Sequence, residues 1–268
     1  MPRLHINTIS LTTFKDVLSR YPTTVPEKLR DLDAQRYTTI PAAVAARPED
    51  TKHLTKNEVE TLVEWKLKHG TFRPTLLGLV RSNNADSIQN STHKAYASLS
   101  NRVKHEALPA LKVLVGFRGI GPATASLLLS VMRPRDVPFF SDELFRWCAW
   151  DDGGEGWGKR IKYNFNEYKV LLNKVIELRM RLGMEAVGAV DVERVAWVLG
   201  KEGRDVGGGS LEEEEEGEGK DAGQAKQDEK EVVEDQVTKP VVSRGTKRKN
   251  QAKESTTQGT RKSTRMKR

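Results

Sequence analysis

Cysteine is almost absent from this chain: Cys148 is the only one among 268 residues. A single cysteine excludes an internal disulfide and is usual for a protein kept in a reducing compartment. The five histidines show no metal-ligand spacing, so a zinc site is not expected. The sequence therefore predicts neither a metal site nor a cofactor.

Long apolar runs are missing as well. No run approaches the ~20 residues that a membrane span needs, and the first residues, Met1 to His5, carry no signal-peptide pattern. The alternation of apolar and polar residues that marks β-strands does not recur, and no internal repeat is present. These absences predict a soluble intracellular all-α protein with no membrane contact.

Helical patterns are plentiful over residues 51–202. The clearest covers Lys56 to His69, where Thr55 and Glu58 form a capping-box pattern at the start. A long amphipathic helix is predicted from Asn164 to Leu182. We expect residues 51–202 to form one helical domain.

The two ends of the predicted helical region carry their own signals. Residues 1–50 are expected to be a helical segment that packs on the domain, with a small-residue connector at Ala42 to Ala46. Near the other end, Asp191 is expected to cap the last helix.

Charge becomes segregated after about residue 203. Residues 211–235 hold 12 acidic and 3 basic side chains, whereas residues 236–268 hold 11 basic and 1 acidic. Such a composition lacks the apolar surface needed to fold, so we predict a disordered acidic-then-basic tail over residues 203–268, with a flexible linker at 205–210. The whole chain carries a net charge of +8. Because the tail nearly neutralises itself, the folded part is basic too, which favours a nucleic-acid partner.

Two basic clusters end the tail, at residues 247–249 and 261–268. They resemble a bipartite nuclear import signal and predict a nuclear protein that binds an import receptor. The alternative is a nonspecific electrostatic arm.

The most informative stretch runs from Phe117 to Ala125. Gly119 and Gly121 permit a tight turn that residues with a Cβ resist, and Pro122 suits the first position of the next helix. A Gly-x-Gly turn before a helix leaves backbone N–H groups free to bind an anion. On a basic chain this anion is a nucleic-acid phosphate. The alternative is an ordinary packing turn between two helices.

This stretch resembles the hairpin of the helix-hairpin-helix DNA glycosylase superfamily, which has the pattern Leu-Pro-Gly-(Val/Ile)-Gly-x-x-Thr-Ala. The matching residues are Gly119, Ile120, Gly121, Thr124 and Ala125, while Phe117 and Arg118 replace Leu-Pro. The resemblance implies a glycosylase-like domain that binds DNA through Arg118, Gly119, Ile120, Gly121 and Thr124. The signatures Trp65-Lys66-Leu67 and Gly70-x-Phe72-Arg73-Pro74 resemble the eukaryotic Amun-like branch.

The family has its catalytic aspartate one helix and one loop after the hairpin, and Asp142 stands at that place. The motif around it, Ser-Asp-Glu-Leu, is similar to the Asp-Asp-Tyr-Leu motif of the alkylbase branch. The resemblance implies that Asp142 stabilises the positive charge that develops on the sugar as the base leaves, and that it assists water. On local sequence alone, Asp142 also fits a helix N-cap.

The chain departs from some members of the family. Bifunctional members carry a lysine in the hairpin slot that Ala123 holds here, so no Schiff base can form at that slot. Iron–sulfur members need four cysteines. The resemblance therefore implies a monofunctional glycosylase without a cluster and without lyase activity.

A flipped base needs an aromatic pocket, for which Trp65 and Phe140 are candidates. Packing against a neighbouring helix is the alternative for Trp65. Two functions stay open at this stage: a monofunctional glycosylase that excises an altered base from DNA, and a non-catalytic nuclear DNA-binding protein with the same fold. A monomer is expected in either case.

Overall fold

The computed structural model describes residues 3–99 and 103–207, so the predicted acidic and basic tail segments lie outside the described residues. The described residues belong to one compact unit. Every regular element within them is helical, as the sequence predicts. The α-helices are α1 (Leu11–Ser19), α2 (Tyr21–Thr24), α3 (Arg30–Ala34), α4 (Ile40–Ala45), α5 (Lys56–His69), α6 (Leu76–Arg81), α7 (Ala85–Ala97), α8 (Val103–Leu114), α9 (Pro122–Met132), α10 (Asp142–Cys148), α11 (Phe165–Leu182) and α12 (Ala189–Lys201).

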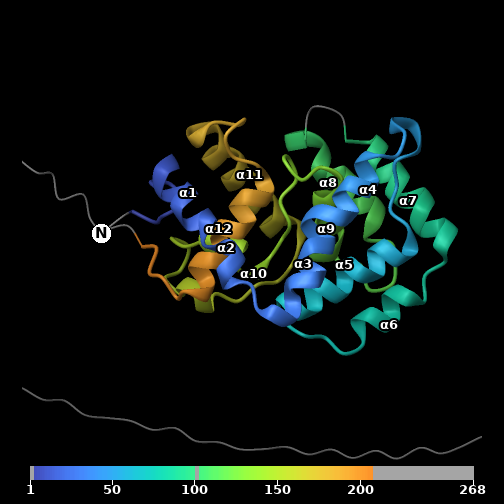
Figure 1. The fold of residues 1–268 in the computed structure, drawn as a ribbon, viewed down its shortest axis with the longest axis horizontal. Coiled ribbons are helices and arrows are strands. Elements are labelled where there is room, and N and C mark those ends of the chain that lie inside the picture. Colours follow the sequence, from blue (N-terminus) through green and yellow to red (C-terminus); the bar gives the residue numbers. More distant parts are fainter. Residues whose placement is uncertain (1–2, 100–102, 208–268) are drawn as a thin grey trace, which may run out of the picture. The chain divides into compact units, whose positions relative to one another are not determined.

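Three short 3-10 turns and one π-helical turn lie between these helices in the described residues. They are the 3-10 turns η1 (Glu27–Leu29), η3 (Glu49–Thr51) and η4 (Gly156–Gly158), and the π-helical turn η2 (Gln35–Thr39). Figure 1 shows the helices in two groups, α3 to α9 on one side and α1, α2 and α10 to α12 on the other. Helix α9 contacts α4, α5, α7, α8 and α11 and so joins both groups. Within the described residues, no helix has the length and apolarity needed to cross a membrane.

Capping boxes fix the starts of the two clearest helices. At α5, the Thr55 hydroxyl accepts a hydrogen bond from the Glu58 N–H at 3.3 Å, and the Glu58 carboxylate accepts one from the Thr55 N–H at 2.8 Å. Asn164 and Glu167 form the same pair of bonds at α11. The predicted helix over 56–69 is confirmed, and the predicted helix at 164–182 begins one residue later because Asn164 is its cap.

Helix α9 is the centre of the core. All its residues from Ala123 to Met132 are buried, as expected for a helix that is apolar nearly all round. Its two serines serve the packing: the Ser126 hydroxyl accepts a hydrogen bond from the Phe140 N–H at 2.9 Å. This bond ties the segment before α10 to the core and so fixes where α10 begins.

The prediction of a connector at Ala42 to Ala46 is wrong. Residues 30 to 45 run through α3, the π-turn η2 and α4 with helical backbone angles at the junctions. Pro41 lies inside this run, in the first turn of α4 and directly after the π-turn η2. Packing of α4 on α9 then favours the helical conformation.

The other end of the domain also differs from expectation. Gly188, not Asp191, is the cap residue of α12; the Asp191 carboxylate reaches back to accept a hydrogen bond from the Gly188 N–H at 2.8 Å. Beyond α12, the predicted flexible linker begins too early. Val206 is fully buried, and the Arg204 carbonyl accepts a hydrogen bond from the Trp157 indole at 2.7 Å. Residues 204–207 therefore pack on the domain.

Candidate functional site

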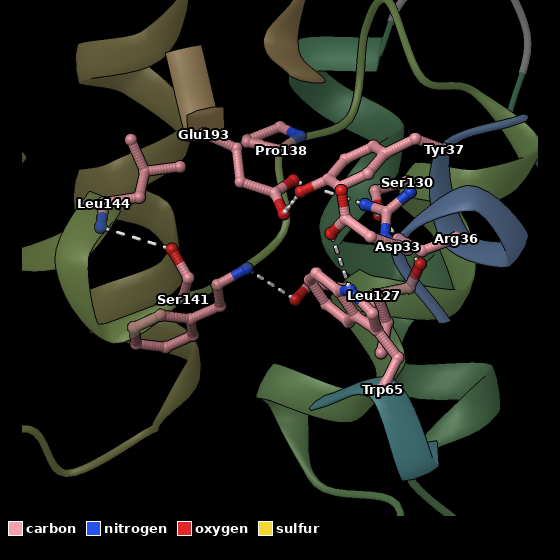
Figure 2. Close-up of polar contacts among 12 residues, drawn as sticks. Asp33, Arg36, Tyr37, Trp65, Leu127, Ser130, Pro138, Ser141, Leu144 and Glu193 are labelled. Carbon is pink, nitrogen blue, oxygen red and sulfur yellow. Dashed lines mark hydrogen bonds and ion pairs between the residues drawn. The ribbon is translucent and has the colours of Figure 1, made fainter. Parts of the chain in front are cut away.

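Asp142 is the first residue of α10, and the residue before it, Ser141, is the N-cap. The Ser141 hydroxyl oxygen accepts a hydrogen bond from the Leu144 N–H at 3.2 Å (Figure 2). The alternative that Asp142 is itself the N-cap is therefore wrong. Because Ser141 caps the helix, the Asp142 carboxylate is available for other contacts.

Two side chains contact the Asp142 carboxylate, which is 19% exposed. The Tyr163 hydroxyl donates a hydrogen bond to Oδ1 at 2.7 Å, and an Arg146 nitrogen lies 3.8 Å from Oδ2. Tyr163 has a φ of 54° and is the single non-glycine residue with positive φ in the described part of the chain. This conformation costs about 1–3 kcal/mol, so neighbouring contacts must hold Tyr163 in place. One of them is Arg73, whose guanidinium lies 5.2 Å from the centre of the Tyr163 ring.

Asp142, Tyr163 and Arg73 line a narrow cleft between the end of α5 and the start of α10. Further lining comes from Lys66, His69, Gly70, Thr71, Phe139, Phe140, Ser141 and Glu143. The cleft has a volume of about 20 Å³. That volume accommodates one water molecule but not a nucleobase.

Lys66 brings an amine into the same cleft as the Asp142 carboxylate. Burial and the nearby charge of Arg73 lower the pKa of Lys66 to about 8, and the charge of Asp142 opposes this shift. Glu143 also lines the cleft, and unlike Lys66 it has an ion-pair partner: the Lys201 amine lies 3.6 Å from its carboxylate. Burial raises the pKa of Glu143.

His69 closes the inner side of the cleft. Its ring stacks on Trp197, with 3.6 Å between ring centres, and lies 4.3 Å from the Trp65 ring. Burial lowers the pKa of His69 well below its ordinary value, and the buried Nε2 atom has no hydrogen-bond partner within the described residues. The imidazole is therefore neutral, with one polar atom unsatisfied beside the cleft.

The two aromatic residues expected in a base pocket, Trp65 and Phe140, lie in different parts of the structure. Phe140 lies in the cleft wall, next to Asp142. Trp65 is fully buried and does not line the cleft; its indole N–H donates to the Asp33 carboxylate at 3.1 Å (Figure 2). The expectation that Trp65 contributes to a base pocket is corrected, because its ring packs in the core.

The hairpin is a tight turn, and Gly119 is the residue that requires glycine. Gly119 has a φ of +77°, and a Cβ there would lie 3.2 Å from the Leu76 carbonyl oxygen. Asn83 holds the turn from the side: its amide accepts from the Arg118 N–H at 3.1 Å and donates to the Arg118 carbonyl at 2.9 Å. Helix α6 and the residue pair that follows it thus fix the hairpin backbone.

The five residues expected to bind DNA differ in exposure. Arg118 and Gly121 are exposed, and Gly121 has open space where a Cβ would point. Ile120 and Thr124 are buried, so their side chains cannot reach a ligand. The hairpin therefore offers the Arg118 side chain and backbone atoms near Gly121 as its accessible groups.

A separate set of polar side chains lies between η2, α9 and α12, and all of them are buried except Tyr37, which is half-buried. It comprises Arg36, Tyr37, Ser130 and Glu193, and we call it the Arg36 cluster. Figure 2 shows Arg36 directed toward Ser130 and Glu193, with Nη2 at 2.6 Å from the Ser130 hydroxyl and 3.2 Å from the Glu193 carboxylate. Tyr37 donates to the same carboxylate at 2.7 Å. Burial raises the pKa of Glu193.

A larger cavity, of about 560 Å³, lies next to this cluster between α2, α3 and α12. Tyr21, Tyr37 and Arg194 contribute polar groups to its wall, but none of the predicted site residues lines it. Its one carboxylate, Asp33, already accepts hydrogen bonds from Tyr21 and Trp65. Among the residues that the structure describes, no group of three or more metal-ligating side chains occurs.

Comparisons with known proteins found no match. No protein-family model, no curated protein and no solved structure matches the chain. The helical fold and the arrangement of its side chains are therefore the basis for inferring what the protein does.

Proposed function

We propose that this protein is a DNA glycosylase that releases an altered base by hydrolysis, with Asp142 as the catalytic carboxylate. The observation that carries the proposal is the connection between the cleft and the hairpin. The segment from Gly70 to Arg81 lines the cleft through Arg73 and packs on the hairpin at Gly119. A duplex bound at the hairpin would therefore lie beside the mouth of the cleft.

The surface of this segment suits DNA. Phe72 is 68% exposed and stands next to Arg73, and Arg118 is exposed on the hairpin. Arginine binds phosphates, and an exposed aromatic ring can stack on bases or fill the gap that a flipped base leaves. The positive net charge of the chain adds attraction that weakens with salt.

In the proposed reaction, the bond between the base and C1′ of the sugar breaks, and its electron pair leaves with the base. The Asp142 carboxylate stabilises the positive charge on the sugar. One water molecule then attacks C1′ and gives its proton to Asp142. Since the cleft has no room for a base, Tyr163 and Arg73 must move outward when DNA binds.

Asp142→Asn tests this proposal directly. The amide keeps the volume and can still accept the Tyr163 hydrogen bond, while Ser141 remains the helix cap. Base release from duplexes with different altered bases, detected by alkali cleavage, should fall by about 10²–10³ in rate. Melting temperature and DNA affinity should change little. Asp16→Asn, an exposed position on α1, is the matched control and should keep wild-type activity.

A second function is supported by the closed cleft. A cleft of about 20 Å³, held shut by the hydrogen bond between Tyr163 and Asp142, admits no base. A protein that only binds DNA needs no such opening. A non-catalytic DNA-binding protein would bind duplexes through the hairpin and release no base. Strong DNA binding together with no base release by the wild type, across all altered bases tested, would establish this second function instead.

A further inference from the structure

Lys66 is placed unlike the other lysines around it. Lys68, two residues further along α5, lies 2.7 Å from the Glu64 carboxylate on the exposed face. Lys201 lies 3.6 Å from Glu143. Lys66 lines the cleft instead, and no carboxylate within 4 Å and no hydrogen bond holds its ammonium group in the described part of the chain. Among residues 3–99 and 103–207, this amine lies in a cleft and has no structural partner.

The surroundings of Lys66 favour the neutral amine. With a pKa of about 8, roughly half of the Lys66 side chains are neutral at pH 8, whereas an ordinary lysine has on the order of one neutral amine in 250 at that pH. Desolvation and a neighbouring cation are the usual means by which proteins make a lysine nucleophilic. Arg73 is that neighbouring cation.

We propose that Lys66 is a nucleophile that attacks the aldehyde of an abasic DNA sugar, which gives the protein an abasic-site lyase activity. The proposal rests on the proposed function, because an abasic sugar is what base release beside Asp142 would leave in the cleft. It also supplies from α5 the amine that is missing at Ala123 in the hairpin. An abasic sugar has no base to accommodate, so it needs less opening of the cleft than base release does.

The reaction is balanced without a redox partner. The Lys66 Nζ lone pair attacks C1′ of the ring-opened sugar. The carbonyl oxygen takes one proton from the amine and one from solvent and leaves as water, and a protonated imine remains. The Asp142 carboxylate then removes a proton from C2′. The C3′–O bond breaks, and its electron pair leaves with the 3′ phosphate. Water finally hydrolyses the imine and restores the Lys66 amine.

Borohydride trapping on a preformed abasic site tests the proposal. Full-length protein is mixed at about pH 8 with a duplex that already carries one abasic site, and sodium borohydride is added to reduce the imine to a stable amine. A denaturing gel should show a covalent protein–DNA adduct, and mass spectrometry of the tryptic peptides should locate it on Lys66. Between pH 6 and pH 8.5, adduct formation should rise with a midpoint near the Lys66 pKa of about 8.

Variants separate this amine from its neighbours. Lys66→Gln and Lys66→Arg should lose the adduct, whereas Lys68→Gln, the matched surface control on the same helix, should keep it. Thermal melting checks that each variant folds, and the peptide assignment on the wild type decides the question even if a Lys66 variant does not. No adduct with the wild type, or an adduct on another residue, overturns the proposal.

Because the abasic site is preformed, the test does not depend on base release. An adduct on Lys66 without any base release would retain the lyase and reject the glycosylase. Base release without an adduct would retain the glycosylase and reject the lyase.

Discussion

The Arg36 cluster and the cleft at Asp142 both bring acidic and basic side chains together, and they do so in different ways. In the Arg36 cluster, opposite charges are in contact: Arg36 Nη2 lies 3.2 Å from Glu193 Oε2. In the cleft, Lys66 and Asp142 line the same wall, but no ion pair joins them in the described part of the chain. The first arrangement holds helices together. In the second, Asp142 is held by Tyr163 and Arg146, while Lys66 keeps no ion-pair partner in the described residues.

Burial explains why the Arg36 cluster must be paired. A buried charge without a counter-charge costs several kcal/mol, about 3–5 when one partner of a pair is removed. Arg36 connects η2 to α9 through Ser130 and to α12 through Glu193. The aromatic rings of Tyr37 and Trp65 cover its guanidinium, at 4.8 and 5.4 Å from the ring centres. The cluster thus fixes three segments that are far apart in the sequence.

The cleft differs in how its charges are held, although the Arg36 guanidinium also keeps two buried nitrogens, Nε and Nη1, without a hydrogen-bond partner in the described residues. Among the residues that the structure describes, Lys66 has no partner that fixes its ammonium group and His69 has an unsatisfied ring nitrogen. Tyr163 has a costly backbone conformation. Unsatisfied groups and backbone strain reduce stability, and they gather at functional sites, where chemistry requires them. The contrast between the two places can be tested by substitutions that affect one and not the other.

Glu193→Gln should have the largest effect, because it leaves the buried Arg36 guanidinium without its counter-charge. The expected loss in the free energy of unfolding is about 3–5 kcal/mol, measured by urea or thermal unfolding. Glu202→Gln is the matched control, since its pair with Arg20 is accessible to solvent. Such a pair contributes about 0–1 kcal/mol. Equal losses in the two variants would contradict a structural role for the Arg36 cluster.

Much of the fold follows from local sequence signals. The capping box at Thr55 and Glu58 gave the start of α5, and the apolar sequence of α9 gave its burial. The continuous helix through η2 and α4 was missed, because the small residues from Ala42 to Ala46 indicate a connector and only packing on α9 shows otherwise. Where a helix depends on tertiary contacts rather than on its own caps, the sequence pattern alone does not predict it.

The cleft was predictable only in part. Asp142 and Phe140 are close in sequence and were both candidates, and the structure brings them together. Lys66 and Tyr163 were not candidates, because they come from distant segments and no periodic pattern marks them. Trp65 was a wrong candidate for the opposite reason: an aromatic residue at the margin of a helix stripe packs in a core as readily as in a pocket.

The next prediction concerns pH and His69. Burial lowers the pKa of His69 well below 6.5 in the folded state. Below about pH 6.5 the unfolded chain therefore binds a proton at His69 that the folded chain does not, and stability is lost as the pH falls. Above that pH the imidazole is neutral in both states and has no effect. The slope reaches at most about 1.4 kcal/mol per pH unit.

His69→Phe isolates this effect, because a phenyl ring can occupy the stack between Trp65 and Trp197 without titrating. The stability of wild type minus variant, from urea unfolding, should be constant above about pH 7 and should fall toward pH 5. Glu193 titrates in both proteins, so its contribution cancels in the difference. A difference that stays constant to pH 5 would show that His69 is protonated without penalty and would remove it from the unsatisfied groups of the cleft.

The smallest effect should come from the two hairpin glycines, which repeat the contrast between structural and functional residues within one turn. Gly119→Ala forces a Cβ into a positive-φ conformation and toward the Leu76 carbonyl, so it should cost about 1–2 kcal/mol. Gly121→Ala points its Cβ into open space at a φ of −94°, so stability should change by no more than about 0.5 kcal/mol.

Gly121→Asp should then keep the fold but weaken DNA binding and flatten its salt dependence, because a negative charge would face the phosphates. Unchanged DNA affinity in a folded Gly121→Asp variant would place the hairpin outside the interface, and the connection between hairpin and cleft would lose its functional meaning.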